Sequence, residues 1–114
     1  MTTPIGNLTA SWVNSSNTYT GIGMSVTSIG ESAASRLLQL SYNSTIVFDV
    51  SKNSFYTLPT TVSGLPSASV GLGRRAFVTD SSNDFSNNVI GVVVTGGGST
   101  PVPVYSDGSS WRIG

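Results

Sequence analysis

Apolar and polar residues alternate with a period of two through most of this chain, and this alternation constrains its fold more than any other feature. The clearest stretches cover residues 22–27 and 38–50, the second interrupted by the pair Asn43-Ser44. A period of two places successive side chains on opposite faces of a β-strand, so each stretch predicts a half-buried strand. Because Asn and Ser favour tight turns, residues 38–50 predict an antiparallel hairpin.

Two further segments extend this pattern. A turn at Lys52-Asn53 leads into residues 54–58, which would continue the hairpin as a meander. An uncharged apolar run at residues 89–95 predicts another strand, buried on both faces. We therefore expect an all-β fold in which antiparallel hairpins and a meander form a small sandwich or sheet module.

The C-terminal residues 101–114 predict a separate hairpin. An Asp-Gly pair flanked by alternating apolar residues is typical of a two-residue type I′ turn. We place this structural turn at Asp107-Gly108, which pairs Val104 with Trp111. The same register puts four apolar side chains on one face, namely Val102, Val104, Trp111 and Ile113.

The order of these stretches predicts one β domain over residues 1–114. It would comprise an N-terminal β-module at about residues 8–58, an irregular crossing over residues 59–75 and a C-terminal β-module over residues 76–114. The crossing is expected because prolines, glycines and serines replace the alternation there. A chain of this length supports a single core of modest size.

The chain carries very few charges, which bears on what covers its surface. Charged residues are 9% of the sequence and the net charge is zero, against about 25% charged residues in a typical soluble domain. Such a surface has little electrostatic protection from association. We therefore expect homo-oligomeric packing to complete the core.

Apolar residues in phase with the alternation are the expected core or subunit-interface anchors: Trp12, Ile22, Met24, Val26, Leu38, Leu40, Ile46, Phe48, Val104, Trp111 and Ile113. Aromatic side chains also stack on sugars, and those outside the alternation are the candidate receptor contacts: Tyr56, Phe85 and Tyr105.

The inventory of reactive side chains argues against catalysis. The sequence has no cysteine and no histidine, which removes disulfides, thiolate metal sites and the usual general base. Asp80 and Asp84 lack the pattern of a calcium loop, so we expect no metal and no cofactor. A lone basic pair, Arg74-Arg75, does not favour nucleic acid. We also expect no signal peptide and no membrane insertion.

Two sets of residues resemble modules of bacteriophage tail-fibre and related virion proteins. One set is Arg-Ala-Phe-Val-Thr-Asp at residues 75–80 with Val-Pro-Val-Tyr-Ser-Asp-Gly-Ser-Ser-Trp-Arg-Ile-Gly at residues 102–114. The other is Trp12 and Asn14 followed by Tyr-Thr-Gly-Ile-Gly-Met at residues 19–24.

The resemblance implies a non-enzymatic structural protein of a phage virion, assembled in the host cytoplasm as a trimeric β-module of tail-fibre or spike type. Its expected partners are further copies of itself, other virion proteins and, for a receptor-binding tip, a host surface glycan. Two alternatives stay open, a capsid decoration or head-fibre protein and a carbohydrate-binding receptor-recognition tip.

Overall fold

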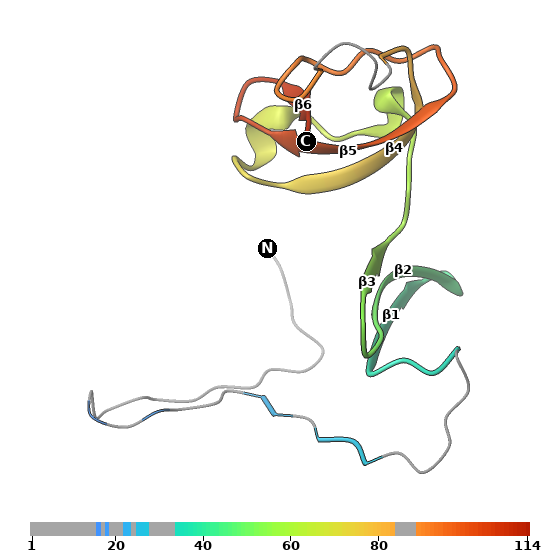
Figure 1. The fold of residues 1–114 in the computed structure, drawn as a ribbon, viewed down its shortest axis with the longest axis vertical. Coiled ribbons are helices and arrows are strands. Elements are labelled where there is room, and N and C mark those ends of the chain that lie inside the picture. Colours follow the sequence, from blue (N-terminus) through green and yellow to red (C-terminus); the bar gives the residue numbers. More distant parts are fainter. Residues whose placement is uncertain (1–15, 17, 19–21, 24, 28–33, 84–88) are drawn as a thin grey trace. The chain divides into compact units, whose positions relative to one another are not determined.

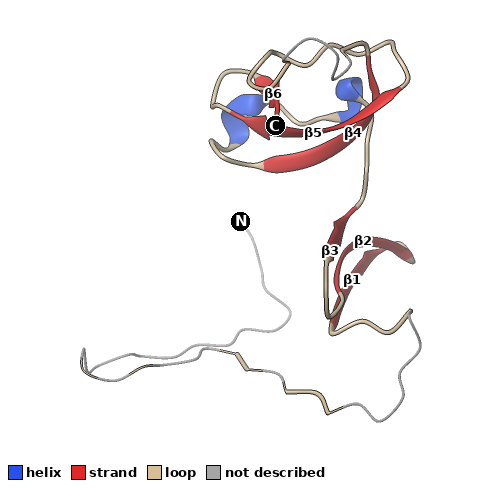
Figure 2. Cartoon of the chain, viewed as in Figure 1, coloured by secondary structure: helices blue, strands red, loops and turns tan. Residues whose placement is uncertain are grey.

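A computed structural model describes residues 16, 18, 22, 23, 25–27, 34–83 and 89–114. The chain divides into two compact units, Met1–Ala33 and Ala34–Gly114. The second unit contains two antiparallel three-stranded sheets and two single-turn 3-10 helices (Figures 1 and 2). No α-helix occurs among the described residues. The predicted all-β class is therefore confirmed.

The first sheet is a meander of β1 (Leu38–Tyr42), β2 (Thr45–Val50) and β3 (Phe55–Thr57), in that order. Asn43 and Ser44 connect β1 to β2 with φ angles of 47° and 64°. Positive φ at both central residues is the requirement of a type I′ turn, whose twist matches that of the strands. The predicted hairpin and meander are both confirmed.

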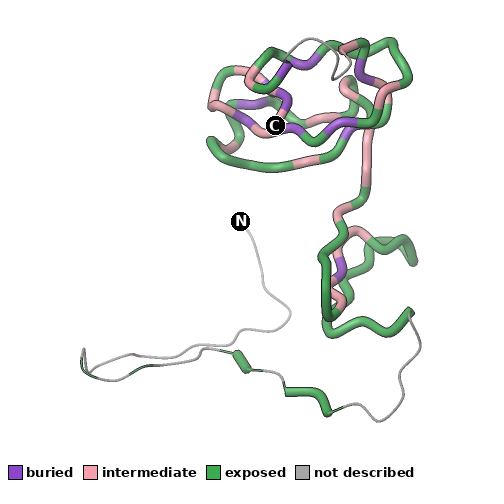
Figure 3. Tube along the Cα trace, viewed as in Figure 1, coloured by how far each residue is buried: buried purple, intermediate pink, exposed green. Residues whose placement is uncertain are grey.

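The second sheet consists of β4 (Arg75–Ser81), β5 (Thr100–Ser106) and β6 (Trp111–Ile113), in the order β4-β5-β6. Alternate residues of β5 and β6 are buried (Figure 3), and the apolar ones belong to one core with residues of other segments. The core residues are Ala68, Val78, Val89, Val94, Val102, Val104, Trp111 and Ile113.

The segment predicted as a crossing packs against the second sheet. It contains the 3-10 helices η1 (Val62–Gly64) and η2 (Ala68–Val70). Ser106 Oγ donates a hydrogen bond of 2.6 Å to the carbonyl oxygen of Ala68, and both residues are buried. The segment is irregular, as expected, but its residues form part of the core of the C-terminal module.

Both edges of the second sheet are covered by other segments. Beside β4, the amide of Thr60 donates to the carbonyl of Phe77, and the amide of Thr79 donates to the carbonyl of Thr60, each at 3.0 Å. Beside β6, the amide of Val94 donates to the carbonyl of Trp111 at 2.9 Å. Covered edges cannot pair freely with strands of another molecule.

Residues 89–95 do not form a strand, so the prediction of a strand there is wrong. The segment forms one isolated bridge, between Val93 and Arg112, and its backbone turns at Gly91, where φ is 84°. Val89 and Val94 are buried, whereas Ile90 is exposed. The left-handed glycine breaks the run, so only part of its apolar surface reaches the core.

The described residues at 22–27 also lie outside any strand, contrary to the prediction. Ile22 is 72% exposed and Val26 is 66% exposed. Alternation determines which side chains would share a face, but a strand also needs a hydrogen-bonding partner. Trp12 and Met24 lie outside the described residues.

The register predicted for the C-terminal hairpin is wrong by two residues. Ser106, not Val104, pairs with Trp111, and Val104 pairs with Ile113. The connection is therefore a four-residue loop, in which φ is positive at Gly108 but not at Asp107. A slip of two residues preserves the faces, and the four apolar side chains predicted to share one face are all buried.

Candidate interaction surface

The sheet β1–β3 presents one apolar face, which we call the Leu40 face. Leu40 pairs with Phe48, while Leu38 and Phe55 both pair with Val50. Residues that pair directly across strands project from the same face, so these five side chains form one array, to which Thr57 opposite Phe48 also belongs. None of the five is charged.

The Leu40 face is open to solvent in the described structure. Leu38 is 40% exposed, Leu40 is 50% exposed and Phe55 is 71% exposed, whereas Phe48 and Val50 are half-buried. The rings of Phe48 and Phe55 lie near each other, with centroids 6.4 Å apart. Figure 3 shows the exposed colour over most of this sheet. Contiguous apolar patches of this kind mark interaction sites.

The reverse face of the same sheet is polar. Gln39, Asp49 and Tyr56 form one cross-strand row, and Arg36 Nε lies 3.1 Å from Asp49 Oδ2. Asp49 is buried although its sheet contributes no residue to the apolar core. The sheet therefore has a charged face and an uncharged face. A partner can exclude water from the uncharged face without the cost of burying charged groups.

Ile46 departs from the predicted phase. The register slips between Leu40 and Ser41, so Ile46 pairs with Ser41 rather than continuing the series of Phe48 and Val50. At such an irregularity, successive side chains no longer alternate strictly between the two faces of the sheet. We therefore leave Ile46 out of the Leu40 face.

A row of aromatic and cationic side chains crosses the outer side of the C-terminal sheet. Tyr105 pairs with Arg75 on β4 and with Arg112 on β6, and Phe77 pairs with Pro103. Tyr105 is half-buried and Phe77 is exposed. An aromatic ring between two guanidinium groups is a mixed apolar and cationic surface.

The candidate receptor aromatics do not share one sheet. Tyr56 lies on β3 and Tyr105 on β5, and Phe85 falls outside the described residues. Among the other predicted anchors, Val104, Trp111 and Ile113 lie in the C-terminal core. The list of anchors missed Ala68, Val78, Val89 and Val94, which reach the core from β4 and from irregular segments.

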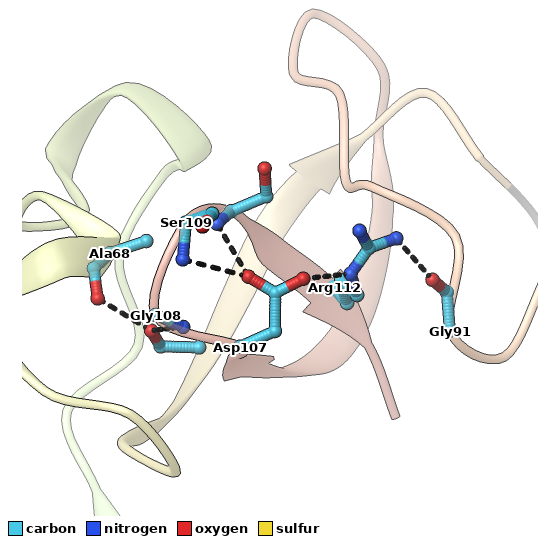
Figure 4. A network of polar contacts seen from close by, with 8 residues as sticks. Ala68, Gly91, Asp107, Gly108, Ser109 and Arg112 are labelled. Carbon is cyan, nitrogen blue, oxygen red and sulfur yellow. Dashed lines mark hydrogen bonds and ion pairs between the residues drawn. The ribbon is translucent and has the colours of Figure 1, made fainter.

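The loop of the C-terminal hairpin holds a compact polar network (Figure 4). Asp107 Oδ1 accepts hydrogen bonds from the amides of Ser109 and Ser110, at 2.8 Å and 2.7 Å. The second oxygen accepts from Arg112 Nε, and Arg112 Nη1 donates to the carbonyl of Gly91 at 2.9 Å. These bonds tie the loop to residues on the other side of β6.

The same network shifts the titration of its charged members. The hydrogen bond from Arg112, with those from the two loop amides, lowers the pKa of Asp107 to about 2. The carboxylate of Asp107 in turn raises the pKa of Arg112. Hydrogen bonds to the charged form of a carboxyl favour ionisation, so the pair stays charged near neutral pH. These hydrogen bonds give the pair of Asp107 and Arg112 a structural role in the loop.

Asp80, considered above as a metal ligand, instead accepts a hydrogen bond of 2.7 Å from the amide of Val62. Within the described residues, no group of three or more acidic, histidine or cysteine side chains is placed to hold a metal ion. No helix in the described part of the chain is long and apolar enough to cross a membrane.

Comparison of the chain with protein-family models, with curated proteins and with solved structures gives no match.

Proposed function

We propose that this chain is a non-enzymatic structural protein of a bacteriophage virion, a homotrimeric β-module of tail-fibre or spike type on the particle surface. The observation that carries the proposal is the open Leu40 face, an uncharged apolar array on a sheet of only three strands. A small sheet of this kind is marginal unless its apolar face is covered. Assembly with further copies provides that cover.

The sequence supports the virion assignment through its resemblance to tail-fibre modules, and the structure supports a positional role. The C-terminal module has a complete core and covered edges, whereas the β1–β3 sheet has an uncovered face. Such a chain can attach through one surface and present the other. Its few charges are consistent with a surface that is partly buried in the particle.

A second candidate function is recognition of a host glycan. Arg75 and Tyr105, which pair across β4 and β5, favour it, since an aromatic ring offers a stacking surface and the exposed guanidinium group of Arg75 donates hydrogen bonds. In this case Tyr105→Ala would reduce adsorption to host cells while leaving the mass of the oligomer unchanged.

Two measurements test the proposal. Sedimentation of the purified chain at micromolar concentration should give the mass of a trimer. Labelling of phage particles with an antibody to the chain, followed by electron microscopy, should place the label on the tail; label on the capsid would replace the tail assignment with a decoration role. A stable monomer together with unlabelled particles would overturn the structural assignment.

A further inference from the structure

We propose that Asp107-Gly108 is a site of spontaneous backbone isomerisation, and that the polar network of the hairpin loop keeps it unreacted while the chain is folded. The modification converts aspartate to isoaspartate and needs no enzyme or cofactor. Asp107-Gly108 is the one Asp-Gly pair in the sequence. The inference concerns the chemistry of the loop and does not depend on the proposed assembly.

The reaction is a ring closure within the chain. The backbone nitrogen of Gly108 attacks the carboxyl carbon Cγ of Asp107, loses its proton, and one carboxyl oxygen leaves as water. Water then adds to either carbonyl of the succinimide ring and reopens it. Opening at the backbone carbonyl gives isoaspartate, in which the main chain runs through the former side chain. Glycine favours the attack because no side chain shields its nitrogen.

The folded loop restrains the attacking nitrogen. The amide of Gly108 donates a hydrogen bond of 3.1 Å to Ser106 Oγ. Ser106 is itself buried, and its hydroxyl donates to the carbonyl oxygen of Ala68 at 2.6 Å. Ring closure requires the nitrogen of Gly108 to leave this partner and turn towards the carboxyl group of Asp107. The acceptor is therefore held in place by the core, which makes that turn costly.

The carboxyl group that would be attacked is restrained at both oxygens (Figure 4). Oδ1 of Asp107 accepts from the amides of Ser109 and Ser110, and Oδ2 accepts from Arg112 Nε. One of these oxygens must leave as water, so the carboxyl group has to be protonated and lose hydrogen bonds before it reacts. The guanidinium of Arg112 favours the ionised carboxylate instead, which is the less reactive form.

Arg112 connects this restraint to a second segment. Its Nη1 donates to the carbonyl oxygen of Gly91 at 2.9 Å, and the amide of Gly91 donates to the carbonyl oxygen of Ile113 at 2.7 Å. A guanidinium that is already anchored loses little further side-chain entropy when it binds the carboxylate. The loop therefore reaches a reactive conformation only by breaking contacts outside itself.

Isomerisation would damage the module that normally prevents it. Isoaspartate lengthens the main chain inside a four-residue loop, whose ends are fixed by the pairing of Ser106 with Trp111. Trp111 is buried and belongs to the core, so a displaced loop moves a core residue. A chain that has opened and reacted cannot restore the same loop. The isoaspartate content of a preparation thus records how long its chains have spent with this loop open.

The natural chain provides the first test. Purified protein is kept at neutral pH and 37 °C for several weeks, either native or unfolded in guanidinium chloride. Tryptic peptides are then analysed by electron-transfer fragmentation, which distinguishes isoaspartate from aspartate at residue 107. We expect isomerisation at least about tenfold slower in the native chain, equivalent to about 1.4 kcal/mol of added activation free energy. Equal rates would overturn the protection, and no isoaspartate in the unfolded chain would overturn the site.

Three variants then separate the network from folding in general. Arg112→Gln removes the charged donor of Asp107 and should raise the native rate several-fold. Arg75→Gln is the matched control, since Arg75 also pairs with Tyr105 but bonds to the carbonyl of Gly114. Val78→Ala is the stability control, because it weakens the core from β4 without touching the loop. Both controls should keep the rate of the natural chain.

The comparison is made on folded variants. Circular dichroism and denaturant unfolding confirm that each variant is native during the incubation. If Arg112→Gln does not fold, Arg112→Lys takes its place, because it keeps the charge but not the planar fork of donors. A rate for the Arg112 variant no higher than that of Val78→Ala would show that folding alone protects the pair, and would overturn the role of the network.

Discussion

The indole Nε1 of Trp111 donates a hydrogen bond of 2.7 Å to the carbonyl oxygen of Pro66, 45 residues earlier in the chain. The side chain is 8% exposed, so its ring is part of the core while its one polar atom is satisfied by the segment before η2. The bond joins the final hairpin to the irregular segment that packs against it.

Removing this side chain should therefore destabilise the C-terminal module. We expect Trp111→Ala to lower the free energy of unfolding by about 3–5 kcal/mol, through lost burial and a residual cavity. Trp111→Phe keeps much of the apolar volume but leaves the carbonyl of Pro66 without its donor, and should cost less. Urea unfolding of both variants measures the difference; equal and small losses would show that the ring is not packed as described.

The polar network of the hairpin loop predicts a pH dependence at acid pH. The pKa of Asp107 is lowered to about 2 in the folded chain, below its ordinary value of about 3.9. The stabilisation is thus fully present above about pH 4 and is lost as the pH falls towards 2. Thermal unfolding between pH 5 and 2 should therefore show a smaller acid loss for Asp107→Asn than for the natural chain. Parallel curves would contradict the assigned hydrogen bonds.

Two glycines in one loop should respond differently to the same substitution. A Cβ atom at Gly98 would collide with the backbone oxygen of Ser81 and lie 2.6 Å from the Cα atom of Ser82. At Gly97 the space is open, but φ is 90°. Gly97→Ala should cost about 1–2 kcal/mol through its left-handed backbone, and Gly98→Ala distinctly more, since backbone must move. Denaturant unfolding compares them, and a smaller effect at Gly98 would count against the close approach of the two chain segments.

The turn between β1 and β2 offers a stabilising change. Ser44 has a φ of 64°, which glycine adopts without the cost that a side chain brings. Ser44→Gly should therefore stabilise the hairpin by up to about 1 kcal/mol, whereas Ser44→Val should destabilise it. Hydrogen exchange at the amides of β2 reports this local effect, and unchanged or faster exchange in Ser44→Gly would argue against the turn.

Sequence reasoning predicted the parts of the fold that depend on neighbouring residues. The hairpin around Asn43-Ser44 follows from local turn chemistry, and the buried face of Val104 and Trp111 follows from alternation. The register of the final hairpin was missed because Asp107 binds two loop amides, which stabilises a longer loop than Asp-Gly pairs usually form.

Other features depend on contacts between distant segments, which no local pattern encodes. The burial of Ala68 against Ser106 joins residues 38 positions apart. The apolar run at residues 89–95 was expected to form a strand, but its path depends on the left-handed backbone at Gly91 and on hydrogen bonds to β6. Of the Leu40 face, the sequence pattern predicted Leu38, Leu40 and Phe48 as anchors but not Val50 or Phe55. It also did not predict the slip at Ile46.

The position of β6 has a consequence for synthesis. Trp111 and Ile113 complete a core whose other members lie between Ala68 and Val104. A nascent chain can form the local β1–β3 meander early, because its contacts are short in sequence, but the C-terminal core must wait for its last strand. A chain terminated before Trp111 would therefore expose its valines to proteases and chaperones, so that truncated products are degraded rather than accumulated.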